Sequence, residues 1–200
     1  MVTIIKPGIS KILQVFHRRR NEKIHLRKLA RETNMQGQGI SRYLQELEKN
    51  KFLKSEKTGN LKQYSLQQNQ QVYATLALFD IEKTQKLPLL RRNAITTYLN
   101  NLPQPPILAL VFGSTAKETY KEESDIDILI ITHEKLDTKK AEKEADALSS
   151  MKISTFQITF EEFKKELKLK EDKVIQSAIT TGYPVLNQAY YYEVLNNERV

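Results

Sequence analysis

Residues 107–132 read ILALVFGSTAKETYKEESDIDILIIT, and this stretch decides the fold of the second half of the chain. It begins with a continuous apolar run, ILALVF, that is typical of a buried strand. Gly113-Ser114 follows at once, and ten residues later Asp125-Ile126-Asp127 leads into a second apolar run that ends at Thr132. The pattern predicts two buried strands joined through a turn of small residues.

The two aspartates of this stretch indicate a metal-nucleotide site. Residues two apart in a strand share a face, so we expect the carboxylates of Asp125 and Asp127 to point the same way. Close carboxylates repel each other unless a proton or a cation lies between them. Their hard oxygens suit Mg²⁺, which also binds phosphate oxygens. Gly113 would let a phosphate approach the backbone, and Ser114 offers a hydroxyl and an amide.

This arrangement closely resembles the signature of polymerase-beta-type nucleotidyltransferases, particularly their minimal prokaryotic members. Gly113, Ser114, Asp125 and Asp127 match the signature directly, and Ser124 before the aspartates is also usual there. The resemblance spans roughly residues 89–170. It implies that the second half of the chain folds as a mixed sheet with flanking helices.

The resemblance also implies an activity. Gly113 and Ser114 would bind the triphosphate, and Asp125 and Asp127 would be the catalytic residues that bind Mg²⁺. Two-metal chemistry would then transfer a nucleoside monophosphate to an acceptor hydroxyl, with pyrophosphate leaving in line. Lys117, one helical turn after Ser114, is either a further phosphate contact or an ordinary solvated lysine.

The third carboxylate of the active family members is missing from the sequence. Those members carry it on a later strand, but the candidate strand here, residues 152–159 (KISTFQIT), contains no acid. Thr155 or Gln157 stands where the acid would be sought, and neither is a charged metal ligand or a strong base. Glu161 and Glu162 follow in a segment of helical periodicity, where we expect them to be acids of the first helical turn; the alternative is that one of them replaces the missing carboxylate.

The first third of the chain has a different pattern. Apolar residues at helical spacing predict helices over residues 9–19, 26–32 and 38–49, and two short extended runs over 52–66 flank a Gly-Asn turn. Residues 8–68 therefore resemble the winged helix-turn-helix domain of many prokaryotic transcriptional regulators. That family places its third helix in the major groove of double-stranded DNA and its hairpin wing against the backbone.

Carried to this chain, the winged-helix resemblance implies two sets of DNA contacts. Residues of the third helix would reach base edges, and cations of the wing would contact phosphates together with Lys54, Arg18 to Arg20 and Arg27 or Lys28. The alternatives are that these polar residues form a solvated helix face, or that the domain docks a protein. The expected DNA-binding residues are Gln38, Ser41, Arg42, Gln45, Lys57 and Lys62.

The distribution of charge agrees with a polyanionic partner for the first third. The net charge is +8, yet residues 1–75 contain 15 Lys/Arg against 5 Asp/Glu, and residues 76–200 contain 17 against 19. The chain has no cysteine and three scattered histidines, so a bound metal must rely on carboxylates. Because no apolar stretch approaches the roughly 20 residues of a membrane span, we expect no membrane partner and a cytoplasmic protein.

The sequence thus predicts an α+β protein of three parts: a winged helix-turn-helix domain (1–70), a helical linker (71–104) and a nucleotidyltransferase-like domain (105–200). The expected function is a DNA-binding transcriptional regulator that binds Mg²⁺ and a nucleoside triphosphate and retains or has lost transfer of the nucleoside monophosphate. The alternatives are a working nucleotidyltransferase that uses the winged helix to recruit its substrate, and an antitoxin-like interaction protein. A homodimer on paired half-sites and a small helical protein partner also remain open.

Overall fold

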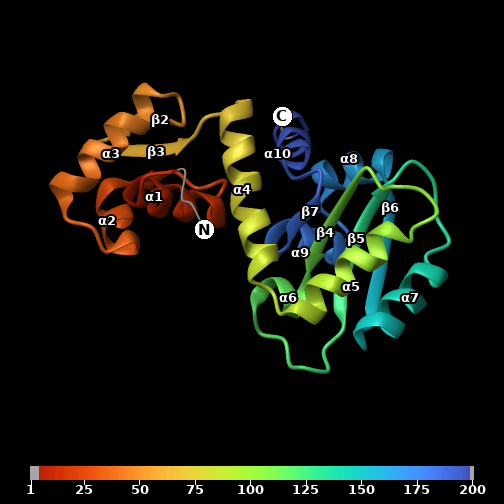
Figure 1. Ribbon diagram of the computed structural model, residues 1–200. Coiled ribbons are helices and arrows are strands. Elements are labelled where there is room, and N and C mark those ends of the chain that lie inside the picture. Colours follow the sequence, from red (N-terminus) through yellow and green to blue (C-terminus); the bar gives the residue numbers. More distant parts are fainter. Residues whose placement is uncertain (1–4, 199–200) are drawn as a thin grey trace. The chain divides into compact units, whose positions relative to one another are not determined.

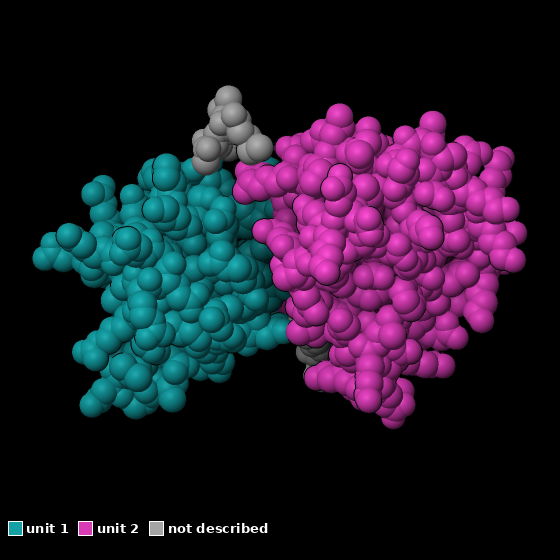
Figure 2. Space-filling model, turned by 90° about the horizontal axis from the view of Figure 1, so that it is seen from below, with its two compact units in different colours: residues 1–79 teal, residues 80–200 magenta. Residues whose placement is uncertain are grey.

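The computed structural model describes residues 5–198 and divides the chain into two compact units, residues 1–79 and 80–200 (Figure 2). Each unit has its own sheet, one of three strands and one of four. The α+β class expected from the sequence is confirmed. Within the described residues, no helix combines the length and apolar character that crossing a bilayer requires.

The first unit consists of three helices and a small sheet. Its helices form where apolar residues recur on one side: Ile12 and Phe16 on the first helix, and Ile40 and Leu44 on the third, are fully buried. The hairpin turns at Gly59, whose φ is +60°. The elements are α1 (Pro7–Arg18), β1 (Ile24–His25), α2 (Leu26–Thr33), α3 (Gly37–Lys49), β2 (Leu53–Thr58) and β3 (Leu61–Leu66).

The helices and the hairpin of this unit are where the sequence predicts them, but β1 is an addition. It pairs antiparallel with β3, so that the sheet has the order β1-β3-β2. A strand of two residues is too short to produce a periodic signal, which is why the sequence did not reveal it. Between α2 and α3 the chain turns at Asn34, which adopts the left-handed conformation with φ 52°.

Two helices fill the segment expected as a helical linker. They are α4 (Gln70–Lys86), which contains the boundary between the units, and α5 (Leu89–Asn100), which belongs to the second unit. Pro88 separates them because a proline cannot continue the hydrogen bonding of α4 and instead precedes the first turn of α5.

The second unit is a mixed sheet in the order β6-β5-β4-β7. The pairs β4–β5 and β4–β7 are antiparallel, and β5–β6 is parallel and joined through the crossover helix α7. The elements are β4 (Leu108–Phe112), α6 (Gly113–Lys117), β5 (Ile126–Thr132), α7 (Lys139–Ser149), β6 (Ile153–Thr159), α8 (Phe160–Leu169), α9 (Lys173–Thr181), β7 (Tyr183–Leu186) and α10 (Gln188–Asn197).

Helices cover both faces of this sheet (Figure 1). Val111 and Ile128 point to the face under α5 and α7, where they join a core with Tyr98 and Ala145. The next residue along each strand points to the opposite face, against which α8 and α9 pack. This alternation places Asp127 on the face opposite α5, which matters for the candidate site.

The edge strand β7 was not predicted from the sequence. It contains Pro184, which lacks an amide hydrogen and is tolerated at the edge of a sheet. In α10, Tyr191 and Tyr192 are buried, whereas Tyr190 is exposed.

Candidate nucleotide site and nucleic-acid interface

The turn between β4 and α6 depends on Gly113. Its φ of +64° lies in the left-handed region, which residues with a Cβ enter only at a cost. A Cβ at this position would lie 2.9 Å from Cγ of Asp127 and closer still to its Oδ2. Phe112 and Asp127 are cross-strand partners, so the register of β4 and β5 brings the carboxylate to the glycine. Glycine is therefore required both for the turn and for the approach of Asp127.

The two aspartates lie in different environments. Asp125 is exposed just before β5 and accepts a hydrogen bond from Oγ of Ser154 at 3.2 Å, whereas Asp127 is partly buried within β5. Burial, and secondly the charge of Asp125, raise the pKa of Asp127 above the ordinary value. Asp125 is thus close enough for its charge to act on Asp127, and a divalent cation would relieve that repulsion.

The strand beside these aspartates presents a serine and a phenylalanine to the site. The parallel register pairs Asp127 with Ser154 and Leu129 with Phe156, and paired residues point to the same face of a sheet. Phe156 is 38% exposed and packs edge-on against Phe112, with 5.4 Å between the ring centroids. Ser154 and Phe156 were not identified as site residues from the sequence.

The expectation that Thr155 or Gln157 occupies the third-acid position is wrong. Thr155 donates a hydrogen bond from Oγ1 to the hydroxyl of Tyr98 at 2.9 Å, on the face covered by α5. Gln157 bonds the main chain of Leu136 through both its amide nitrogen and its oxygen. Both therefore point away from Asp127, because the parallel register pairs Asp127 with Ser154, the residue before Thr155.

The acids after β6 do not replace the missing carboxylate. Glu162 forms a capping box with Thr159: its Oε2 accepts from the Thr159 amide at 3.0 Å, and these bonds lower the pKa of Glu162. Glu161 pairs with Lys164 at 2.7 Å. Their expected role as acids of the first turn of α8 is confirmed. Within residues 5–198, no group of three acidic, histidine or cysteine side chains is placed to hold a metal ion.

The remaining residues expected to bind nucleotide lie on α6. Ser114 is partly exposed in its first turn, next to Gly113, and its carbonyl accepts from the amide of Thr119 at 3.0 Å. Lys117 is exposed at the other end of this short helix. That position suits either a phosphate contact or a solvated lysine.

The residues expected to read DNA share one exposed stripe of α3. Gln38, Arg42 and Gln45 are exposed and Ser41 is partly exposed, whereas the opposite side of the helix is buried. Lys49 continues the stripe by one further turn and was not singled out from the sequence.

The hairpin carries two lysines directly opposite each other. Lys57 on β2 is the cross-strand partner of Lys62 on β3, and like charges in this position destabilise a hairpin. Lys62 bonds Glu48 of α3 at 2.8 Å and lies over the ring of Tyr64, and its bond to Glu48 raises the pKa of Lys62. The expected wing cations are therefore both exposed, but Lys62 is already paired within the unit.

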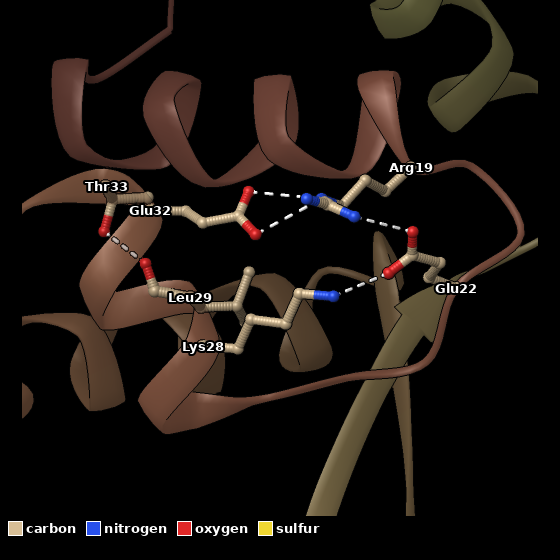
Figure 3. Close-up of polar contacts among 6 residues, drawn as sticks. All are labelled: Arg19, Glu22, Lys28, Leu29, Glu32 and Thr33. Atoms are coloured by element: carbon tan, nitrogen blue, oxygen red, sulfur yellow. Dashed lines mark hydrogen bonds and ion pairs between the residues drawn. The ribbon is translucent and has the colours of Figure 1, made fainter.

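Some cations expected to contact phosphates are paired between α1 and α2 (Figure 3). Arg19 binds Glu22 at 2.8 Å and Glu32 at 3.2 Å, and Lys28 binds the other oxygen of Glu22 at 2.7 Å. The hydrogen bonds from Lys28 and Arg19 lower the pKa of Glu22. Acids from the α1–α2 loop and from α2 therefore hold Arg19 within the unit.

Comparison with known protein families identifies the second unit. Residues 93–187, just under half of the chain, match the family model described as polymerase beta, nucleotidyltransferase. This match includes all four signature residues described above, and the chain therefore contains a nucleotidyltransferase-type domain.

Comparison with solved structures and curated proteins adds little to the family match. One solved structure, titled "Crystal structure of the toxin-antitoxin with AMP-PNP", is similar with 18% sequence identity and a TM-score of 0.36, covering 51% of this chain and 80% of that one. A likeness of that strength carries no argument about ligands or partners. Comparison with curated proteins gives no match.

Proposed function

We propose that this chain is a DNA-binding transcriptional regulator whose nucleotidyltransferase-type domain binds a nucleoside triphosphate with Mg²⁺. The observation that carries the nucleotide part is the carboxylate of Asp127 lying against Gly113, next to Asp125. This arrangement supports a cation site directly beside the Gly113-Ser114 turn, whose backbone amides and hydroxyl would receive phosphate.

Each residue of the proposed site has a separate task. Asp125 and Asp127 would hold Mg²⁺, and Gly113 and Ser114 would receive the phosphates with backbone amides and a hydroxyl. The cation would supply positive charge that offsets the charge of the phosphates. Ser154 is neutral and donates a hydrogen bond to Asp125, so it supplies neither a charged ligand nor a base. This favours binding over transfer.

A working nucleotidyltransferase is the second candidate, because the Gly-Ser turn and both aspartates are present. In that reaction the oxygen of an acceptor hydroxyl would bond to the α-phosphorus, and the bond from that phosphorus to the pyrophosphate oxygen would break. The acceptor proton would pass to solvent or to Asp127, since the neighbouring strand offers Ser154 in place of an acid.

Calorimetric titration of ATP, GTP, CTP and UTP with Mg²⁺, followed by an assay for released pyrophosphate, separates the two candidates. If the unmodified protein binds nucleotide but releases no pyrophosphate, and Asp125→Asn/Asp127→Asn does not bind, the regulator is supported. If the unmodified protein binds nucleotide and releases pyrophosphate, the enzyme is supported. Glu144→Gln/Asp146→Asn on α7 is the control, because it removes two acids away from the site. Absence of binding by the unmodified protein contradicts both candidates.

For the first unit we propose the winged-helix mode of DNA binding, with α3 in the major groove and the β2–β3 hairpin against the backbone. The exposed stripe of α3 and the opposed lysines of the hairpin support this proposal. A homodimer would match paired half-sites one helical turn apart.

The DNA proposal is tested by selecting a binding sequence from random duplexes and then measuring Arg42→Ala on it. Loss of a base-edge contact costs about 1–3 kcal/mol and relaxes specificity at one position. Lys173→Ala, an exposed cation of the second unit, is the control for net charge. If Arg42→Ala binds the selected site as tightly and as selectively as the unmodified protein, α3 does not read bases.

A further inference from the structure

A buried arginine lies outside the site described so far. Arg91 of α5 is 2% exposed, although arginine side chains are rarely buried unless paired. Nη1 donates to Oγ1 of Thr115 at 3.0 Å, and Nη2 donates to the carbonyls of Lys121 and Ser124, each at 2.8 Å, and more distantly to that of Glu122 at 3.5 Å. All four acceptors are neutral oxygens, so the guanidinium is held by its hydrogen bonds to them and not by a carboxylate.

These acceptors belong to the two halves of the proposed nucleotide site. Thr115 is two residues after Gly113 on α6, and Ser124 immediately precedes Asp125. The loop between them is also attached to Arg91 through Tyr120, whose ring centroid lies 4.1 Å from the guanidinium carbon. One side chain therefore connects the phosphate turn with the segment that carries the first aspartate.

A second bond makes the loop end rigid. The hydroxyl of Ser124 accepts from the amide of Lys121 at 2.9 Å, which closes a turn just before Asp125. Arg91 donates to the carbonyls of the first and the last residue of that turn, Lys121 and Ser124. The planar fork of arginine suits several acceptors at fixed directions, whereas a lysine has a single nitrogen and cannot reproduce the pattern.

We propose that Arg91 is a positioning residue that holds the phosphate turn at Gly113-Ser114 and the metal ligand Asp125 in register, so that nucleotide and metal bind together. This inference rests on the proposed nucleotide function. Because Arg91 bonds both segments, a ligand that orders one of them also orders the other, and the second ligand then loses less conformational entropy on binding. Arg91 should therefore control the coupling between the two ligands more than the affinity for either alone.

The test measures ATP affinity in Mg²⁺ and in EDTA, and Mg²⁺ affinity without nucleotide, for the unmodified protein and for Arg91→Lys and Thr115→Val. We expect the gain in ATP affinity caused by Mg²⁺ to fall about tenfold in Arg91→Lys, as for the loss of one or two hydrogen bonds, and less in Thr115→Val. The affinities for each ligand alone should stay close to those of the unmodified protein.

Chemical rescue distinguishes positioning from general support of the fold. In Arg91→Ala, added methylguanidinium at a non-denaturing concentration should restore the Mg²⁺-dependent gain, and methylammonium should not. A retained gain in Arg91→Lys, or equal rescue by both cations, overturns the inference and leaves the nucleotide function intact. Absence of Mg²⁺-dependent ATP binding by the unmodified protein overturns both.

Discussion

The carboxylate of Asp127 fills the space that a side chain at Gly113 would need. The strand register brings the two residues together, because Asp127 is the cross-strand partner of Phe112, the last residue of β4, which immediately precedes the glycine. The conformation of the turn and the position of the metal-binding carboxylate therefore depend on each other.

Gly113→Ala tests this dependence, with Gly59→Ala as its control. Both glycines have positive φ, +64° and +60°, but a Cβ at Gly59 meets nothing within 4 Å. Gly59→Ala should lose about 1–2 kcal/mol of stability from the backbone alone. Gly113→Ala should lose more and should also lose Mg²⁺-dependent nucleotide binding, because Asp127 must move. Denaturant unfolding measures the loss of stability, and calorimetry measures nucleotide binding. Equal losses of stability in the two variants would show that Asp127 does not crowd a side chain at position 113.

The raised pKa of Asp127 predicts a trade-off between stability and binding. A carboxyl whose pKa is higher in the folded than in the unfolded state binds more protons when folded, so metal-free stability falls as pH rises from the ordinary value of about 3.9 through the folded value. At higher pH the folded protein keeps the free-energy cost of a charged, partly buried carboxylate. Asp127→Asn removes this cost and should raise the melting temperature at neutral pH in EDTA, while it abolishes stabilisation by Mg²⁺.

Asp125→Asn is the matched variant for this prediction. It leaves the burial of Asp127 in place and removes only the neighbouring charge, which is the smaller cause of the shift. Its gain in melting temperature should therefore be smaller than that of Asp127→Asn. Urea unfolding as a function of pH tests the predicted direction, which is a fall in metal-free stability as pH rises through the folded-state pKa of Asp127. If stability instead rises over this pH range in the unmodified protein and not in the variants, the prediction is wrong.

Restoring the third carboxylate tests the register of β5 and β6. Ser154→Asp places an acid beside Asp125 and on the face of Asp127, and it should increase Mg²⁺ affinity about tenfold, as expected for one added charged contact. If the second candidate function holds, it should also increase pyrophosphate release. Thr155→Asp, one residue further, points to Tyr98 and should only destabilise. Higher metal affinity in Thr155→Asp instead would mean that the register is wrong.

The structural features that could be predicted from the sequence are those determined by residues close together in the chain. The run from Leu108 to Thr132 predicts both central strands and the glycine turn, because periodicity and small residues are local signals. The pairing of Ser154 with Asp127 was missed because the crossover through α7 sets that register, and a shift of one residue exchanges the two faces of a strand. Arg91 left no signal either, because three of its four acceptors are main-chain carbonyls that any residue could supply.

The opposed lysines of the hairpin give the last prediction. Lys57 faces Lys62 across the strand pair, and Lys62 has Glu48 as its partner. Lys57→Gln should therefore raise the stability of the free protein slightly, because it removes a like-charge pair. If the hairpin lies against phosphates, the same change should weaken DNA binding and reduce the slope of log affinity against log salt concentration by about one.

The control for Lys57→Gln is Lys173→Gln, which changes net charge equally on the second unit. Fluorescence anisotropy with one duplex over a range of salt concentrations gives the slopes, and thermal melts give the stabilities. A slope that falls equally in both variants would show that net charge alone attracts DNA. A slope that falls only in Lys57→Gln would place a phosphate at the hairpin, since each released counterion reports one neutralised phosphate.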